Sequence, residues 1–195
     1  IELLITILMF MVVFLSGLTN GLGRSVSAQI DNYGSLHYIL STDSEGIIPF
    51  STIKAKDLDE VQKIEGMDYS GLSIQRATVS KTEDSNTLDI TYFATDHNEK
   101  EILNPIMEDT DLKISDLKKN EVILDSSFKE DEGIQVGDHV IDKTSKQKLK
   151  VVAFAKNAKY GYSEIGFISS DTYTGMRQKT DPSYQWQAQT LVTKK

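Results

Sequence analysis

The side chains that most often carry catalysis or bind metal ions are scattered through this sequence. Its three histidines, His37, His97 and His139, lack the four-residue spacing and the H-E-x-x-H context that would bring two imidazoles onto one helix face. The chain has no cysteine, which excludes a disulfide framework, a thiolate zinc site and an iron–sulfur cluster. The sequence therefore predicts no metal site.

Glycine-rich and acidic segments are the next candidates for a ligand site. Residues 133–138 read G-I-Q-V-G-D, which lacks the lysine and hydroxyl of a phosphate-binding loop and predicts a tight turn before a strand. The acidic runs 108–111 and 130–132 lack the alternating ligands and the closing glutamate of an EF-hand, so we expect solvated loops there. No nucleophile elbow is present. We therefore predict no catalytic residue, no cofactor bound by this chain, and a protein that is not an enzyme.

Four tyrosines and the single tryptophan concentrate in the C-terminal third of the chain: Tyr160, Tyr162, Tyr173, Tyr184 and Trp186. Side chains with an apolar ring and a polar end suit a membrane interface, a partner surface or the half-buried edge of a core. Of these interpretations we favour the structural one.

The elements that would position these side chains are short strands mixed with short helices, which indicates an α+β domain. The alternation is clearest at Leu88, Ile90, Tyr92 and Ala94, which predicts a strand with one face toward a core. Strands are predicted over 36–40, 67–80, 87–95, 121–124, 139–142, 149–154, 165–168 and 189–193, and helices over 24–33, 54–64 and 170–178. We expect the last helix to be capped by Ser170 or Asp171, and residues 96–120 to form a loop with one helical turn.

The charge of the chain is uneven along its length. The 21 basic and 29 acidic residues give a net charge of −8, and no run of five basic residues occurs, so nucleic-acid binding is not expected. Residues 3–23 carry no charge and would form a helix of about 31 Å, the thickness of a bilayer core. The sequence therefore predicts a transmembrane helix over 1–23 in a lipid bilayer and an acidic domain over 24–195.

Two features of the apolar segment leave alternatives open. Val26-Ser27-Ala28 would suit a signal peptidase, and a secreted enzyme would follow, although the apolar run is long for a signal peptide and no basic residue precedes it. Ser16, Gly17 and Gly21 place small residues four positions apart, which lets a second membrane helix approach closely. The same glycines could instead loosen the helix where it meets water.

Several sequence phrases recur in a recognisable order. The apolar segment contains V-F-L-S-G-L-T-N-G-L at 13–22. Downstream, E-V-I-L-D-S-S-F at 121–128 is followed by G-I-Q-V-G-D at 133–138, V-V-A-F-A-K-N-A-K-Y-G at 151–161 and I-G-F-I-S at 165–169. In this order and spacing the phrases resemble ABC-transporter permeases of the FtsX/MacB type, most closely the HrtB/DevC-like branch, over nearly the whole chain.

The resemblance implies an α+β fold in which an N-terminal transmembrane helix is followed by a MacB-like extracytoplasmic core domain of mixed sheet with short helices. It also implies a permease homodimer in the cell membrane, with residues 24–195 on the extracytoplasmic side and ATP bound by a separate cytoplasmic ABC ATPase subunit. Such a domain would couple ATP-driven helix movement to export, with haem as one substrate in this branch, or to mechanotransmission.

Because family members continue into three further membrane helices, the resemblance implies that this chain is a fragment. No haem ligand can be transferred to the three histidines. The alternative is a single-pass, membrane-tethered extracytoplasmic binding or signalling module.

Overall fold

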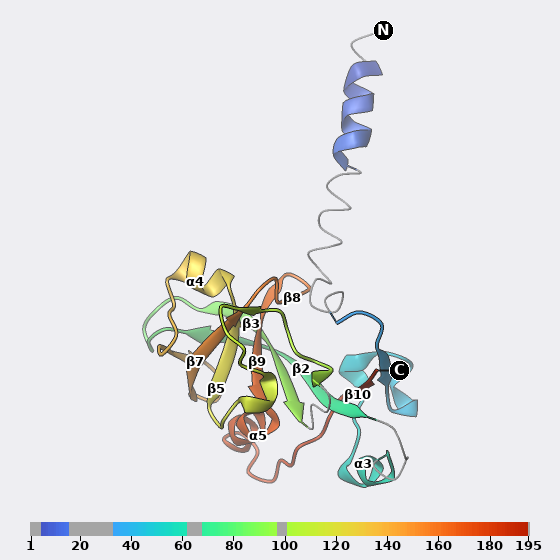
Figure 1. The fold of residues 1–195 in the computed structure, drawn as a ribbon, viewed down its shortest axis with the longest axis vertical. Coiled ribbons are helices and arrows are strands. Elements are labelled where there is room, and N and C mark those ends of the chain that lie inside the picture. Colours follow the sequence, from blue (N-terminus) through green and yellow to red (C-terminus); the bar gives the residue numbers. More distant parts are fainter. Residues whose placement is uncertain (1–4, 16–32, 62–67, 97–100, 195) are drawn as a thin grey trace.

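The computed structural model describes residues 5–15, 33–61, 68–96 and 101–194 (Figure 1). Residues 5–15 form a helix whose apolar side chains are more than half exposed. Within the described ranges, no helix combines the length and the apolar character needed to cross a membrane. The predicted helix-packing residues Ser16, Gly17 and Gly21 lie outside the described residues, as do residues 24–32 of the helix predicted over 24–33.

The remaining described residues form one mixed sheet with short helices, as the sequence predicts. The strands are β1 (His37–Ile39), β2 (Tyr69–Ser80), β3 (Leu88–Asp96), β4 (Met107–Glu108), β5 (Glu121–Asp125), β6 (His139–Asp142), β7 (Lys148–Ala155), β8 (Lys159–Tyr160), β9 (Ser163–Ser169) and β10 (Thr190–Thr193). The helices are η1 (Thr42–Ser44), η2 (Ile48–Phe50), α3 (Ala55–Val61), η4 (Ile114–Asp116), α4 (Ser127–Glu132) and α5 (Ser170–Gln178).

Six strands of this sheet close into a ring. The pairs run β2–β3–β9–β5–β7–β6, and β6 returns to β2 through Val79↔Asp142 and Ser80↔Ile141. The β3–β9 and β5–β7 pairs are parallel and the other four are antiparallel. Closure satisfies the backbone groups that an open sheet edge would leave unpaired.

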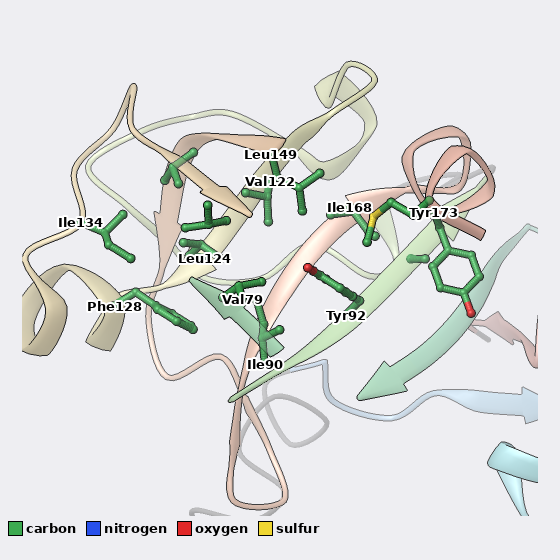
Figure 2. Packing of buried hydrophobic residues seen from close by; sticks show 14 of the residues in the cluster. Val79, Ile90, Tyr92, Val122, Leu124, Phe128, Ile134, Leu149, Ile168 and Tyr173 are labelled. Carbon is green, nitrogen blue, oxygen red and sulfur yellow. The ribbon is translucent and has the colours of Figure 1, made fainter. Parts of the chain in front are cut away.

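The inside of the ring is the main hydrophobic core (Figure 2). Alternate residues point inward because side chains on a strand have a period of two, and Ile90, Tyr92 and Ala94 of β3 meet Val122 and Leu124 of β5 there. The two ends of this core are covered by helical segments: Phe128 and Ile134 at α4, and Tyr173 and Met176 at α5. The predicted alternation of β3 is thereby confirmed.

A second core covers the outer face of the same strands. Phe93, Ile123 and Phe167 point outward from β3, β5 and β9 and are fully buried. They are covered by residues from the segment between β3 and β5, including Leu103 and Ile114. The predicted loop over 96–120 is therefore an ordered cover over its described residues, and it also contains the short edge strand β4, which the sequence did not predict.

A third, smaller core lies where the two ends of the domain meet. Strands β1 and β10 pair antiparallel through Tyr38↔Val192, and β10 pairs with the first residues of β2. Helix α3 contributes Leu58 to a cluster with Tyr69 and Leu191. The entry and exit strands of the domain are therefore neighbours in one sheet.

Two local predictions need correction. Helix α5 has the predicted bounds, but its N-cap is Ser169 and not Ser170 or Asp171. The Ser169 hydroxyl accepts a hydrogen bond from the Thr172 backbone N–H at 3.2 Å, and Ser170 and Asp171 lie in the first turn. The two-residue strand β8, which pairs with β9, was not predicted because so short an element has no detectable period.

Candidate functional site

The described histidines do not converge. His37 lies on β1 and His139 on β6, both exposed, and His97 lies outside the described residues. Over the part of the chain that the structure describes, no three His, Asp or Glu side chains gather closely enough to hold a metal ion. The residues with the most distinctive environments are instead carboxylates and aromatic rings.

The segment 133–138 is a turn, as predicted. Gly133 ends α4 with φ +65°, and Gly137 has φ +99°, so both positions favour glycine. The turn is fixed by Asp138, whose carboxylate accepts a 2.8 Å hydrogen bond from the Gln135 N–H, and by the Gly137 N–H, which donates to the Val151 carbonyl at 2.8 Å. Its glycines serve the turn geometry.

Four of the five C-terminal aromatics are structural. Tyr173 is buried and makes edge contacts with Tyr184 and Trp186, with ring centroids 6.0 and 5.9 Å away. Tyr160 packs edge-on against a core ring, Phe93, at 5.6 Å. Tyr162 differs, because 83% of its surface is exposed. The structure thus supports the favoured interpretation for all but Tyr162.

Trp186 joins two cores. Its indole packs against the main hydrophobic core inside the six-stranded ring, which we call the ring core, and against the smaller cluster beneath α3. Among the described residues, it is the one side chain that packs against both. Its indole N–H donates a hydrogen bond to Asp96, the last residue of β3. Gly71 faces Asp96 on the neighbouring strand, and a Cβ at Gly71 would stand 1.9 Å from the carboxylate Oδ1. We call Gly71, Asp96, Tyr173 and Trp186 the junction.

A carboxylate also lies inside the ring core near α5. Asp142 is 2% exposed and its Oδ2 accepts a 3.2 Å hydrogen bond from the Tyr92 hydroxyl, while its Oδ1 accepts bonds from the Ser145 N–H and hydroxyl at 2.6 and 2.7 Å. Burial, reinforced by the Asp142 charge, raises the pKa of Tyr92 well above its ordinary value. The phenol therefore stays protonated and satisfies the buried carboxylate, which is a structural arrangement.

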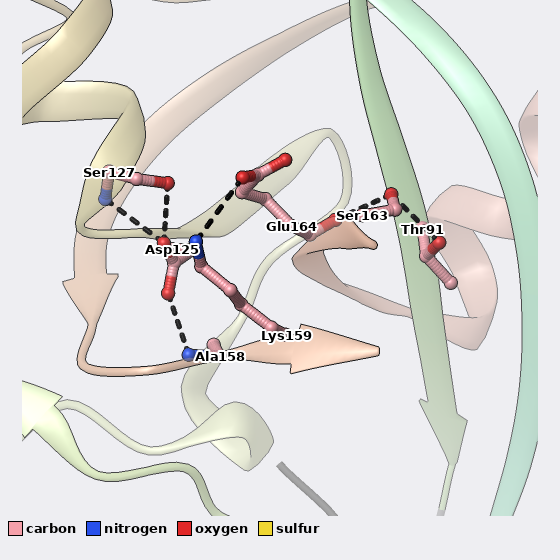
Figure 3. A network of polar contacts seen from close by, with 7 residues as sticks. All are labelled: Thr91, Asp125, Ser127, Ala158, Lys159, Ser163 and Glu164. Carbon is pink, nitrogen blue, oxygen red and sulfur yellow. Dashed lines mark hydrogen bonds and ion pairs between the residues drawn. The ribbon is translucent and has the colours of Figure 1, made fainter. Parts of the chain in front are cut away.

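A second buried carboxylate holds the other end of the sheet (Figure 3). Asp125 accepts hydrogen bonds from the Ser127 N–H and hydroxyl at 3.0 and 2.6 Å and from the Ala158 N–H at 2.6 Å. Nearby, Lys159 pairs with Glu164 at 3.5 Å across β8 and β9. These contacts tie the end of β5 to the β7–β8 connection, and both carboxylate oxygens of Asp125 accept hydrogen bonds there.

An open cleft of about 520 Å³ lies beside β4, β7 and α4. Phe154 and Val152 form an apolar wall, and Val136, 62% exposed, stands at its rim. Glu108 and Lys129 form a 3.2 Å ion pair across the cleft. The walls of the cleft are therefore of mixed apolar and charged character.

The described domain is a closed ring of six strands, with its first and last strands paired beside the ring. Its family is shown by sequence: residues 3–193 match the MacB-like periplasmic core domain, and the chain belongs to this family of extracytoplasmic domains of permease-type ABC transporters. The expected superfamily, the mixed-sheet domain and the association of such a component with a membrane and an ATPase subunit are thereby confirmed.

A solved structure with a TM-score above 0.5 shares the fold. The periplasmic region of MacB from Actinobacillus actinomycetemcomitans superposes with a TM-score of 0.59 at 10% identity, covering 88% of this chain and 79% of that chain. The extracellular domain of the noncanonic ABC-type transporter YknZ from Gram-positive bacteria gives a TM-score of 0.49 at 10% identity, covering 82% and 81%.

Sequence reasoning missed the junction and the buried Asp142. Asp96 and Trp186 are 90 residues apart, and neither belongs to a motif. The one available signal was composition: a single tryptophan in a polar segment needs a partner for its N–H when it is buried.

Proposed function

We propose that this chain is the first transmembrane helix and outer domain of an ABC permease, which transmits ATP-driven helix movement to the extracytoplasmic side. The observation that carries the proposal is the extent of the family match, because it begins at residue 3, within the apolar segment, and continues to residue 193. Residues 1–23 would then lie in the bilayer and residues 24–195 outside it.

The path of the backbone supports a coupling role. Strand β1 follows the apolar segment in the chain, and β10 is the last strand described; the two pair directly, from His37↔Thr193 to Ile39↔Leu191. A displacement of either chain end would therefore move both strands together.

Strand β2 connects these end strands to the ring. Its residues 69–72 pair with β10 and its last two pair with β6, so one strand of twelve residues, roughly 40 Å long, spans the domain. Its neighbour β3 ends at Asp96, where Trp186 links the cluster beneath α3 to the ring core. We infer that movement of the end strands reaches the ring as a rigid-body shift through β2 and the junction.

In this proposal the assembly is a permease homodimer of the HrtB/DevC-like branch, together with a cytoplasmic ATPase that binds the ATP. Ser16, Gly17 and Gly21 would pack against a neighbouring membrane helix. The movement could drive export, for example of haem, or mechanotransmission, and the phenotype of a deletion strain distinguishes these two functions. A strain that loses the gene and becomes sensitive to haem would support haem export, whereas unchanged haem tolerance would remove it.

Membrane topology can be tested by cysteine labelling because the chain has no native cysteine. In the full-length gene product, Tyr162→Cys adds a thiol at the most exposed large side chain described outside the helix at 5–15. We expect a membrane-impermeant maleimide to label it in intact cells. Met9→Cys, in the apolar helix, should be labelled only after detergent is added, and labelling of Tyr162→Cys only after cell lysis would contradict the proposal.

Coupling can be tested at Trp186. We expect Trp186→Phe to retain the ATPase subunit on co-purification but to lower the transport or resistance phenotype of a complemented deletion strain. Tyr162→Phe is the matched control, since that ring is exposed and should be dispensable. A single-pass module would co-purify with no ATPase, and that outcome would favour the alternative function.

A further inference from the structure

The β6–β7 hairpin is basic although the chain as a whole is acidic. Residues 139–150 read H-V-I-D-K-T-S-K-Q-K-L-K and contain four of the 21 basic residues, in a protein of net charge −8. Their one acid, Asp142, points into the ring and is fully satisfied there. Every other ionisable side chain of the hairpin is at least partly exposed.

Strand pairing places His139, Lys148 and Lys150 on one outer face, and Lys143 and Lys146 lie in the turn that joins the two strands. His139 pairs with Lys150 and Ile141 with Lys148, and paired residues share a face of the sheet. Lys148 and Lys150 alternate along β7, so their attachment points stand roughly 7 Å apart. Lys81, which follows β2, lines the same hollow as His139, Ile141 and Lys148, and its ammonium donates a hydrogen bond to the Glu132 carbonyl.

These ammonium groups are not neutralised within the domain. The ion pairs described elsewhere are Lys113–Glu101, Lys129–Glu108 and Lys159–Glu164. Among the described residues, no carboxylate lies within 4 Å of the ammonium of Lys81, Lys143, Lys146, Lys148 or Lys150. Leaving five cations without ion pairs on an acidic protein creates a local attraction for an external anion.

The face is hollowed and its backbone is fixed. A cavity of about 400 Å³ is lined by Lys81, Thr82, Glu83, His139, Ile141 and Lys148. Lys143 donates a 2.9 Å hydrogen bond to the Glu83 carbonyl and thereby fastens the β2–β3 loop to the hairpin. The turn itself is held by the two bonds from Ser145 to Asp142. Glu83 is the one acid in the lining, against three basic or imidazole side chains.

We propose that this face, defined by Lys81, His139, Lys143, Lys146, Lys148 and Lys150, is a binding surface for an extracytoplasmic polyanion of the phosphodiester or polyphosphate type. Repeating phosphates would contact the row of lysines along β7 while one phosphate occupies the hollow beside the Thr82 hydroxyl. A lipid surface is a poorer fit, because a membrane-bound face needs apolar side chains to insert, and none of the exposed large hydrophobic residues described lies on this hairpin.

The test measures binding of inorganic polyphosphate to the full chain in neutral detergent, and it needs no transport activity. If four lysines contact phosphates, the affinity for polyphosphate should fall roughly 50- to 150-fold between 50 and 200 mM salt, because each contact releases counterions from the charged polymer. The variant K148Q/K150Q should bind more weakly, and its affinity should fall only about 7- to 12-fold over the same range. The control K118Q/K119Q changes two exposed lysines elsewhere and removes the same charge.

Three results would overturn the proposal. One is equal affinity and equal salt dependence for the two double variants. Another is binding to vesicles containing phosphatidylglycerol but not to polyphosphate, which would assign the face to lipid. The third is concentration-dependent self-association that K148Q/K150Q abolishes, without polyphosphate binding, which would assign the face to a second copy of the chain. Because topology is not measured, failure of the transport proposal would leave these outcomes unchanged.

Discussion

Gly71→Ala offers a direct test of the junction. The new Cβ would stand 1.9 Å from Asp96 Oδ1 and 2.9 Å from its Cγ, which is closer than non-bonded atoms approach. Since the obstructing atoms belong to a side chain, the carboxylate can rotate away, and the cost is then the hydrogen bond from Trp186 that it abandons. A hydrogen bond to a charged group contributes about 1.5–3 kcal/mol, so we expect the free energy of unfolding to fall by about that amount.

A double-mutant cycle makes this expectation specific. Trp186→Phe removes the same hydrogen bond and part of the ring contact with Tyr173, so it should cost about 2–4 kcal/mol. If both substitutions act through one bond, the double variant should lose about 1.5–3 kcal/mol less than the sum of the single losses. Urea unfolding of the full chain in neutral detergent, followed by far-ultraviolet circular dichroism, measures all four proteins.

Fluorescence gives an independent reading, because Trp186 is the only tryptophan of the chain. In folded Gly71→Ala we expect its emission to shift to longer wavelength as the indole N–H turns to water. Additive losses in the cycle, or a Gly71→Ala protein with unchanged stability and emission, would refute the proposed geometry of the junction.

Three further predictions concern the ring core. Gly166→Ala should lower the free energy of unfolding by about 1–3 kcal/mol, because its Cβ would lie 2.6 Å from Ile90 Cδ1 in a packed interior; urea unfolding measures this, and a neutral result would contradict the packing. Gly175→Ala in α5 should be neutral or stabilising by up to about 1 kcal/mol in the same assay, since nothing lies closer than 3.4 Å and alanine favours helix; a loss above 1 kcal/mol would count against it. Because the pKa of Tyr92 is raised in the folded protein, above pH 10 the unfolded chain releases a proton that the folded chain retains, and the free energy of unfolding should fall as the pH rises. Tyr92→Phe should make that fall less steep, as measured by urea unfolding between pH 9 and 11. An unchanged dependence on pH in this variant would contradict the prediction.

Local structure was largely readable from the sequence, and strands occur at all eight predicted positions. One reason is that a strand such as β3 has an inward set of apolar residues with a period of two. The turn at 133–138 was predictable because glycines there adopt positive φ. Such features depend on residues that are near one another in the chain.

Closure of the ring was not predictable in the same way. The β2–β6 pairing joins Val79 to Asp142, and the parallel β5–β7 pairing has no local signature. Phe93 illustrates the difficulty: it lies on the face of β3 opposite to Tyr92, yet both are buried, so polarity alone does not tell which face meets which core. The basic hairpin face was hidden likewise, because its lysines are interrupted in sequence and are brought together by strand pairing.

Strand β2 connects the end strands of the domain to the basic hollow beside the β6–β7 hairpin. Its first residues pair with β10, the strand beside the chain's entry, and its last residue, Ser80, pairs with Ile141 in the lining of the basic hollow. If ATP-driven movement shifts β10, it shifts the hollow as well, and the two states would hold a polyanion with different affinities. Linkage then requires the polyanion to shift the equilibrium between those states by the same factor. Polyphosphate should therefore change the distribution of the assembled permease between its ATP-bound and ATP-free arrangements. At the same polyphosphate concentration, K148Q/K150Q should show a smaller change, while both arrangements remain accessible.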